Sequence, residues 1–321
     1  MVYMAGDSSL SSMVDPNLEE IGMAGSSGNT KILVLADKAG DGNARLLDVK
    51  KNGTVELPLQ QIWLKRPNEV ETGRMETLQS FVGFGVSHYK ADHYLLIIWG
   101  HGDGWKGAAQ DSDDFLTLPE MREALAGYRM DIIAFDACSM ATMECYAEIE
   151  GYCSYIIASQ KTMPTAGMPY GEILGNLTGK SPVNAGKMIV DKYMTAYSTK
   201  KKDPESFSLE LSLLRTGSGL TQGFREYANG STRLDLTRRI GFENPDLADL
   251  GSVIADSRVA KLVGKTVVKI GAWNNPEGSM NVNGACGMSI YCPKGAVDSE
   301  YNATMLAMST GWVSMMQRAG R

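Results

Sequence analysis

The sequence predicts an α/β fold in which helices cover both faces of a central, mostly parallel sheet. Two apolar stretches, residues 93–99 (HYLLIIW) and 131–135 (DIIAF), have the length and composition of buried strands. Between them, Thr117 and Glu120 enclose a proline in the pattern of a capping box, which predicts a helix that runs to about Gly127. Two strands joined by a helix are parallel, so we expect their carboxyl ends to meet at one edge of the sheet, where open α/β sheets place their sites.

The remaining elements of the first 205 residues fit the same alternation of strands and helices. Asn52-Gly53 stands between alternating residues, which predicts a hairpin with a type I′ turn over residues 45–57. Further strands are expected at residues 2–4, 31–37 and 155–158, and further helices at residues 75–89 and 139–149.

The pattern loosens after about Ser206. We therefore predict a main domain over residues 1–205 and a C-terminal part, residues 206–321, that completes the sheet and adds a partly helical subdomain. In this second part, strands are expected at residues 207–214, 266–270 and 288–292, and helices at residues 246–254 and 304–318.

Composition excludes some classes of function. The 321 residues are 43% hydrophobic and 21% charged, as in ordinary globular proteins, and the formal net charge is −6. A mildly acidic protein has no electrostatic reason to bind nucleic acid or an anionic membrane. No apolar run reaches the length of a membrane-spanning helix. We expect a monomer.

The cysteines are sparse and odd in number, so they form no disulfide framework, and no CxxC spacing suggests structural zinc. At least one thiol should be free among Cys138, Cys145, Cys153, Cys286 and Cys292. No signal peptide is visible. Val2-Tyr3-Met4 nevertheless reads as the tail of a strand that begins upstream, so an exported protein with a trimmed signal is slightly favoured over a cytoplasmic one.

His101 and Cys138 are the candidate catalytic residues. His101 lies between two glycines after one predicted strand, and Cys138 follows the other at the expected start of a helix. A helix N-terminus lowers a thiol pKa, and an imidazole at the same sheet edge would complete an activated nucleophile. From position alone, Cys138 could equally be a small buried hydrophobe and His101 a turn residue.

Several separated segments resemble clostripain-like cysteine peptidases, family C11 of the clan that includes caspases, legumains and gingipains. The catalytic signature of that family is similar to residues 94–105 (YLLIIWGHGDGW) and 135–144 (FDACSMATME). Weaker likenesses follow in the family's order, at residues 3–7, 116–120, 158–170, 246–250 (DLADL) and 287–293 (GMSIYCP).

The resemblance implies a caspase-like fold and a cysteine endopeptidase that acts through a thioester. It implies that His101 is the general acid/base and Cys138 the nucleophile, with the backbone N–H groups of Gly102 and Cys138 as the oxyanion hole. What orients the His101 ring is left open. Two alternatives to hydrolysis also stay open: a catalytically silent, peptide-binding member of the fold, and a transpeptidase.

The resemblance further implies cleavage after Arg or Lys, through acidic residues in the substrate-binding pocket. Asp136 matches one of these acids, although it could equally cap the strand end. Ala166 stands where the family has a second acid, Gln160 replaces a common glutamate, and Lys161 adds a positive charge. We therefore expect relaxed selectivity for basic residues.

Two loops carry weaker signals. Asp111-Ser112-Asp113-Asp114 lacks the glycine and the final glutamate of an EF-hand loop, so we expect no metal site and no cofactor. Loose calcium binding there stays open, because some family members use calcium. Lys106, the basic residue between His101 and Thr117, is a candidate site of self-cleavage during maturation, with a simply exposed loop as the alternative.

Overall fold

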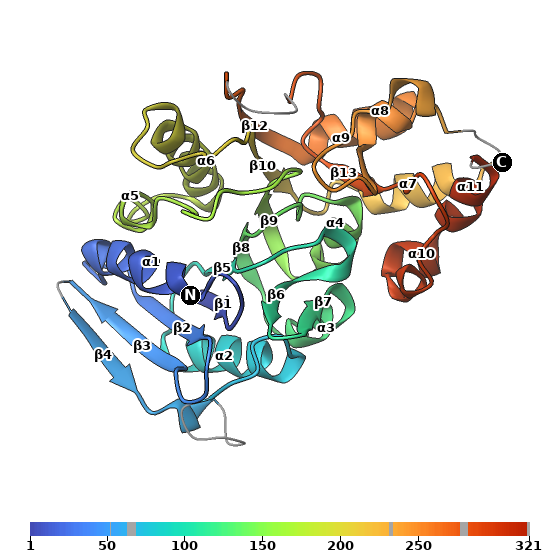
Figure 1. Cartoon of the computed structure of the whole chain (residues 1–321). Coiled ribbons are helices and arrows are strands. Elements are labelled where there is room, and N and C mark those ends of the chain that lie inside the picture. The colour runs from blue at the N-terminus through green and yellow to red at the C-terminus, as the bar shows by residue number, and fades with distance from the viewer. Residues whose placement is uncertain (52, 63–68, 231–233, 277–281, 320–321) are drawn as a thin grey trace.

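A nine-stranded sheet forms the centre of the computed structural model, which describes residues 1–51, 53–62, 69–230, 234–276 and 282–319. The strand order is β12-β10-β9-β8-β5-β1-β2-β3-β4 (Figure 1). The five middle strands, β9 to β2, pair in parallel, and the two strands at each margin pair antiparallel. The strands are β1 (Val2–Gly6), β2 (Ile32–Lys38), β3 (Arg45–Lys50), β4 (Gly53–Leu57), β5 (Leu95–Trp99), β8 (Met130–Asp136), β9 (Cys153–Ala158), β10 (Leu209–Arg215) and β12 (Val267–Trp273).

Alternating side chains of the strands build one apolar core on each face of this sheet. In β1, Tyr3 and Ala5 join one core, whereas Val2 and Met4 join the other. Successive residues of a strand point to opposite faces, so a strand buried on both faces is apolar throughout. This confirms the prediction of an α/β fold with helices on both faces.

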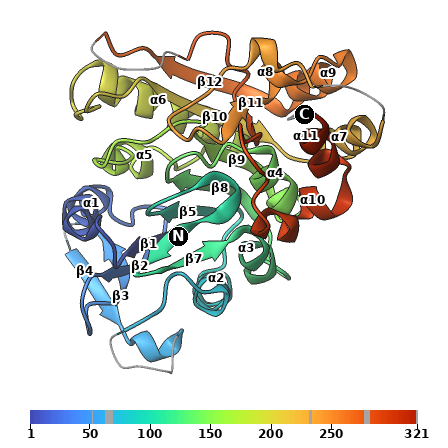
Figure 2. The ribbon, with the colours of Figure 1, turned by 45° about the vertical axis from the view of Figure 1, so that its right-hand side comes forward.

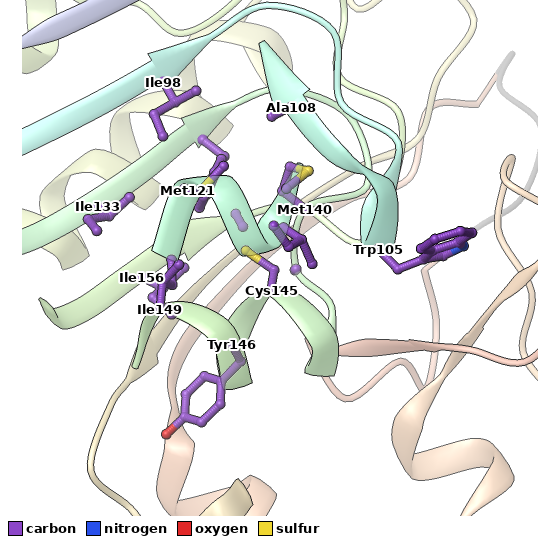
Figure 3. Packing of buried hydrophobic residues seen from close by; sticks show 14 of the residues in the cluster. Ile98, Trp105, Ala108, Met121, Ile133, Met140, Cys145, Tyr146, Ile149 and Ile156 are labelled. Atoms are coloured by element: carbon purple, nitrogen blue, oxygen red, sulfur yellow. The ribbon is translucent and has the colours of Figure 1, made fainter. Parts of the chain in front are cut away.

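Helices α1, α5 and α6 cover one face, and α2, α3 and α4 cover the other (Figure 1). The helices of the first face are α1 (Ser11–Ala24), α5 (Tyr170–Leu174) and α6 (Pro182–Ser198), and those of the second are α2 (Met75–His88), α3 (Leu118–Ala124) and α4 (Met143–Ile149). Figure 3 shows the second core, where Met121 of α3 and Cys145 of α4 lie over the sheet residues Ile98, Ile133 and Ile156.

Strands β5 and β8 are neighbours and parallel, as predicted, with Trp99 paired to Asp136 at their carboxyl ends. Between them the chain forms a hairpin of β6 (Gly107–Asp111) and β7 (Asp114–Thr117), and then α3. The predicted capping box is present: the Thr117 hydroxyl accepts from the backbone N–H of Glu120, whose carboxylate accepts from the backbone N–H of Thr117.

The chain beyond residue 205 adds β10 and β12 to the main sheet and places its remaining elements at that end of the molecule (Figure 2). These elements include a second small sheet of β11 (Leu247–Asp249) and β13 (Ser289–Tyr291). The helices of this part are α7 (Leu220–Asn229), α8 (Leu250–Val253), α9 (Ser257–Thr266), α10 (Met305–Ser309) and α11 (Trp312–Ala319). Single 3₁₀ turns lie at Leu236–Arg238 and Glu300–Ala303 in this part, and at Leu59–Gln61 and Gly104–Lys106 earlier in the chain.

Two helix predictions in this part are wrong in detail. Residues 246–254 begin as strand β11, because Leu247 and Asp249 pair with Tyr291 and Ser289 of β13, and become helical only at Leu250. Residues 304–318 form two helices that are separated at Thr310, which has an extended backbone.

The predicted N-terminal hairpin is present as β3 and β4, but its turn includes Asn52, which lies outside the described residues. No helix in the described part of the chain has both the length and the apolar character that crossing a membrane requires.

Candidate active site

His101 and Cys138 lie two residues beyond the paired ends of β5 and β8. Trp99 and Asp136 are partners in the parallel ladder, so both loops leave the same edge of the sheet. The two side chains line one cavity of about 240 Å³. Its other described walls are Leu10, Trp99, Gly100, Asp136, Ala137, Thr162, Met163, Pro164, Thr165, Gly167, Glu205 and Phe207.

The glycines around His101 are required by close backbone approach. A Cβ on Gly102 would lie 2.5 Å from the carbonyl oxygen of Cys138, and Gly100 has a φ of 146° that side chains disfavour. The loops that carry His101 and Cys138 therefore pack backbone against backbone at this point.

Ser9, in the loop between β1 and α1, contacts the His101 ring. Its Oγ lies 2.8 Å from Nε2 of His101. Ser9 is thus the candidate for the group that orients the His101 ring, which the sequence analysis left open. It comes two residues after the segment 3–7 that resembles the family, and that resemblance was the one sequence feature close to it. Burial lowers the pKa of His101, so the ring is neutral at pH 7. Among the described residues, Nδ1 of His101 has no hydrogen-bond partner, so this nitrogen is free for proton transfer.

Cys138 does not start a helix, which corrects the prediction of a helix from residue 139. Ser139 has a φ of 60°, and the backbone N–H groups of Ser139 and Ala141 donate to carbonyls of Lys161 and Ser159. These bonds hold the segment in irregular backbone, and α4 begins only after its cap Thr142. The helix dipole therefore does not act on this thiol.

The Cys138 thiol is uncharged at rest. Burial raises its pKa, the negative charges of Asp136, Glu243 and Glu205 raise it further, and a hydrogen bond opposes the rise. That bond is the backbone N–H of Met163, 3.3 Å from Sγ. A neutral thiol beside a neutral imidazole becomes a nucleophile when the imidazole accepts its proton.

Two backbone N–H groups are free beside the thiol. In the part of the chain that the structure describes, neither the N–H of Gly102 nor that of Cys138 donates a hydrogen bond. Unpaired N–H groups next to a nucleophile can hold a developing oxyanion. The geometry thus fits the predicted oxyanion hole.

Asp136 is buried in the wall of the same cavity. Its Oδ2 accepts from the backbone N–H of Met168 and from the hydroxyl of Tyr170, each at 2.8 Å. Burial raises its pKa, which the hydrogen bonds from Met168 and Tyr170 and the charge of Lys202 counteract. Asp136 therefore both fixes the loop after β9 and contributes to the lining of the cavity.

The three substituted positions after β9 do not line the cavity. Ala166 is half-buried, and its carbonyl accepts from Nζ of Lys202 at 2.7 Å. Lys161 is buried and pairs with Glu243 at 2.7 Å, so its charge is not directed at substrate. Gln160 is also buried and connects three segments: it donates to Asp249 and accepts from the N–H of Gly287.

The two loops with weaker sequence signals, residues 111–114 and Lys106, lie in and directly before the β6–β7 hairpin. Asp111 ends β6 and Asp114 begins β7, and the carboxylate of Asp111 accepts from the backbone N–H and the hydroxyl of Thr72. Within the described residues, no group of three or more His, Cys, Asp or Glu side chains is arranged to hold a metal. Lys106 pairs with Asp103 and directly precedes β6; cleavage there stays a prediction.

The model of the clostripain family, peptidase family C11, matches residues 2–218. The chain belongs to the clostripain family. Clostripain of Hathewaya histolytica is 32% identical over 94 residues, which are 24% of this chain and 18% of that protein.

Solved C11 proteases share the fold over nearly the whole chain. A secreted C11 cysteine protease from Bacteroides thetaiotaomicron, in complex with an irreversible peptide inhibitor, has a TM-score of 0.78 at 22% identity, covering 98% of both chains. An inactive zymogen C11 protease from Parabacteroides distasonis has a TM-score of 0.76 at 22% identity, covering 96% of both chains. The fold of this clostripain-family chain is therefore caspase-like, as the resemblance implied.

Proposed function

We propose that this clostripain-family protein is a cysteine endopeptidase in which Cys138 is the nucleophile and His101 the general acid/base. The observation that carries the proposal is one cavity of about 240 Å³ lined by both side chains, beside two free backbone N–H groups. A thiol, a base and an oxyanion hole at one point are the parts that acyl transfer needs.

The reaction follows from these positions. His101 accepts the thiol proton of Cys138 through Nδ1, and the sulfur attacks the carbonyl carbon of the scissile peptide. The oxyanion receives hydrogen bonds from the N–H groups of Gly102 and Cys138. His101 then donates the proton to the leaving amine, which leaves a thioester on Cys138. Finally His101 takes a proton from water, and the resulting hydroxide attacks the thioester carbonyl carbon. The C–S bond breaks, the carboxylic acid product leaves, and His101 returns the proton to the Cys138 sulfur.

The side chain before the scissile bond is proposed to be Arg or Lys, with relaxed selectivity. Asp136 is a carboxyl group in the cavity wall, and a guanidinium or ammonium beside it would favour its charged form. The alanine at position 166 removes the second acid that the family resemblance led us to expect.

The proposal also covers the oligomeric state, the cofactor requirement and the location of the protein. We propose a monomer that cleaves peptides or proteins without a cofactor, and chelation by EDTA should leave turnover unchanged. Export is also proposed, with support from the neighbouring Bacteroides protease that is described as secreted. Light scattering and cell fractionation test the monomer and the export.

Hydrolysis of fluorogenic peptides by variants tests the catalytic pair. Cys138→Ala and His101→Ala should each lose at least ~10³-fold in kcat/KM, because the nucleophile or the general base is gone. Melting temperatures near that of the wild type would show that the fold is kept. Full hydrolysis by folded Cys138→Ala would refute the assignment, and labelling of Cys138 by an electrophilic peptide excludes a silent binding protein.

A further inference from the structure

We infer that Glu205 is a second carboxylate for basic substrates, supplied by the loop between α6 and β10 in place of an acid at position 166. The inference rests on the proposed peptidase function and names a residue that determines its specificity. Glu205 lines the same cavity as Cys138 and Asp136. It lies 67 positions after Cys138 in the sequence, on a different element, so only the fold brings it to the site.

The loop that lacks an acid holds Glu205 in place. Oε1 of Glu205 accepts from both the backbone N–H and the hydroxyl of Thr165, at 3.0 and 2.8 Å. On the other side of Ala166, a Cβ on Gly167 would lie 2.7 Å from Oδ2 of Asp136. Residues 165–167 therefore lie between the two carboxylates, and Glu205 stands beside the position where the acid is missing.

The second carboxylate oxygen of Glu205 is available to a ligand. Within the described residues Oε2 has no hydrogen-bond partner, and the side chain is exposed, so water stabilises its charge. The backbone of Glu205 has a φ of 54°, a conformation that non-glycine residues rarely adopt. Such a conformation persists where surrounding contacts fix it, as those with Thr165 and Asp203 do.

The charge balance of the cavity favours a cation. Its described lining contains Asp136 and Glu205 but neither lysine nor arginine. The two nearby lysines are already engaged: Lys202 with Glu20 and the Ala166 carbonyl, and Lys161 with Glu243. Burial disfavours the charged form of Asp136 in the empty site, whereas Glu205 is solvated. The exposed carboxylate of Glu205, in the lining of the cavity, is thus placed to attract Arg or Lys.

Binding to an inactive protein tests this inference independently of turnover. In the Cys138→Ala background, calorimetry compares two peptides that differ only in Arg or Gln at the residue before the cleavage point. Glu205→Gln should lower the preference for Arg about tenfold, the effect of losing one charge-assisted hydrogen bond. Gln keeps an oxygen that accepts from Thr165, so the loop should keep its geometry.

Asp203→Asn is the matched control, because Asp203 is an exposed acid on the same loop that does not line the cavity. The Asn side chain keeps the oxygen that accepts from the backbone N–H of Glu205, so only the charge is removed. It should change the preference less than about twofold, since an exposed charge without contact to the ligand is screened by solvent and salt. An unchanged preference in Glu205→Gln, or equal binding of both peptides before that change, would overturn the inference. Failure of the proposed peptidase function is seen separately, as an absence of hydrolysis with Cys138 intact.

A second readout uses the free enzyme. Glu205 is one of the charges that raise the pKa of Cys138, after burial, Asp136 and Glu243. Glu205→Gln should therefore move the pH at which Cys138 reacts with iodoacetamide downward, while Asp203→Asn should leave it in place. An identical pH profile in Glu205→Gln and wild type would mean that Glu205 does not act at this cavity.

Discussion

The proposed catalytic pair, Cys138 and His101, has pKa values that both shift toward the uncharged forms. Burial raises the pKa of the Cys138 thiol and lowers that of the His101 imidazole, so the stable resting pair is thiol and imidazole rather than thiolate and imidazolium. Catalysis then depends on proton transfer during the attack, and His101 must be deprotonated to accept that proton.

The first prediction is the pH dependence of kcat/KM. Protonated His101 cannot act as a base, and its pKa is lowered from the ordinary value of 6.5. The midpoint of the acid limb should therefore lie below pH 6.5. A profile that rises only above pH 8, with ionisation of the free thiol, would show that His101 is not the base.

The second prediction concerns Ser9, the partner of Nε2 in His101. Ser9→Ala frees the ring to rotate, so kcat should fall about tenfold while KM changes little, since general acid–base catalysis is worth about 10²–10⁴-fold and only part of it is lost. Ser9→Thr retains the hydroxyl and should restore most of kcat. Equal kcat for all three proteins would remove Ser9 from the mechanism.

At the scale of elements, unbroken apolar strands were predictable and irregular connections were not. Strands β5 and β8 are apolar on both faces, and the capping box at Thr117 marks the start of α3 in the sequence. Helical periodicity could not reveal that the chain after Cys138 bonds to the end of β9 instead. Pro16 lies inside α1, and an internal proline argues against predicting a helix from the sequence. The helix forms nevertheless, because Val14 and Ile21 pack into the core.

In the candidate site, too, the residues that follow predicted strands could be foreseen and those on irregular loops could not. His101, Cys138 and Asp136 follow recognisable strands, so their approach could be deduced from parallel pairing. Ser9 and Glu205 come from loops far away in the sequence, and no local pattern distinguishes them from solvated polar residues.

The third prediction tests the connection of β9 to β11 and β13 through Gln160. Its amide donates to Asp249 at 3.1 Å, and Glu210 accepts from its backbone N–H. Gln160→Glu would place a carboxylate against that of Asp249 in a buried site, which should cost about 1–3 kcal/mol of the free energy of unfolding at pH 8. Denaturant titrations should show a smaller loss at pH 5, where protonation restores a donor; equal losses at both pH values would contradict the charge argument.

At the scale of the whole molecule, buried acids link stability to pH. Burial raises the pKa of Asp37 to about 8, with Glu69, Asp111 and Asp7 adding to the rise, and it raises the pKa of both Glu144 and Glu210 to about 7. These groups bind more protons in the folded than in the unfolded chain, where carboxyl pKa values are near 4. Stability should therefore decrease as pH rises from about 4 to about 8.

The fourth prediction isolates Asp37, whose Oδ2 is buried without a hydrogen-bond partner among the described residues. Asp37→Asn mimics the protonated acid at every pH, so it should raise the melting temperature at pH 9 by about 3 °C or more relative to wild type. At pH 4, near the ordinary pKa of 3.8, the carboxyl group is protonated in the folded chain and substantially protonated in the unfolded chain, so the two proteins should melt at nearly the same temperature. A variant that is equally destabilised at pH 4 and pH 9 would show that Asp37 is needed as a carboxylate.

Cys138 as the nucleophile is the central claim, and covalent labelling tests it most directly. The other cysteines are Cys145, Cys153 and Cys292, which are buried, and Cys286, whose thiol donates to the Met288 carbonyl. A peptidyl acyloxymethyl ketone with Lys at its reactive end should add one label per molecule, mapped to Cys138, in wild type and in a variant with the other four cysteines changed to Ser. A label that persists in folded Cys138→Ala, or that maps to another cysteine, would contradict the account.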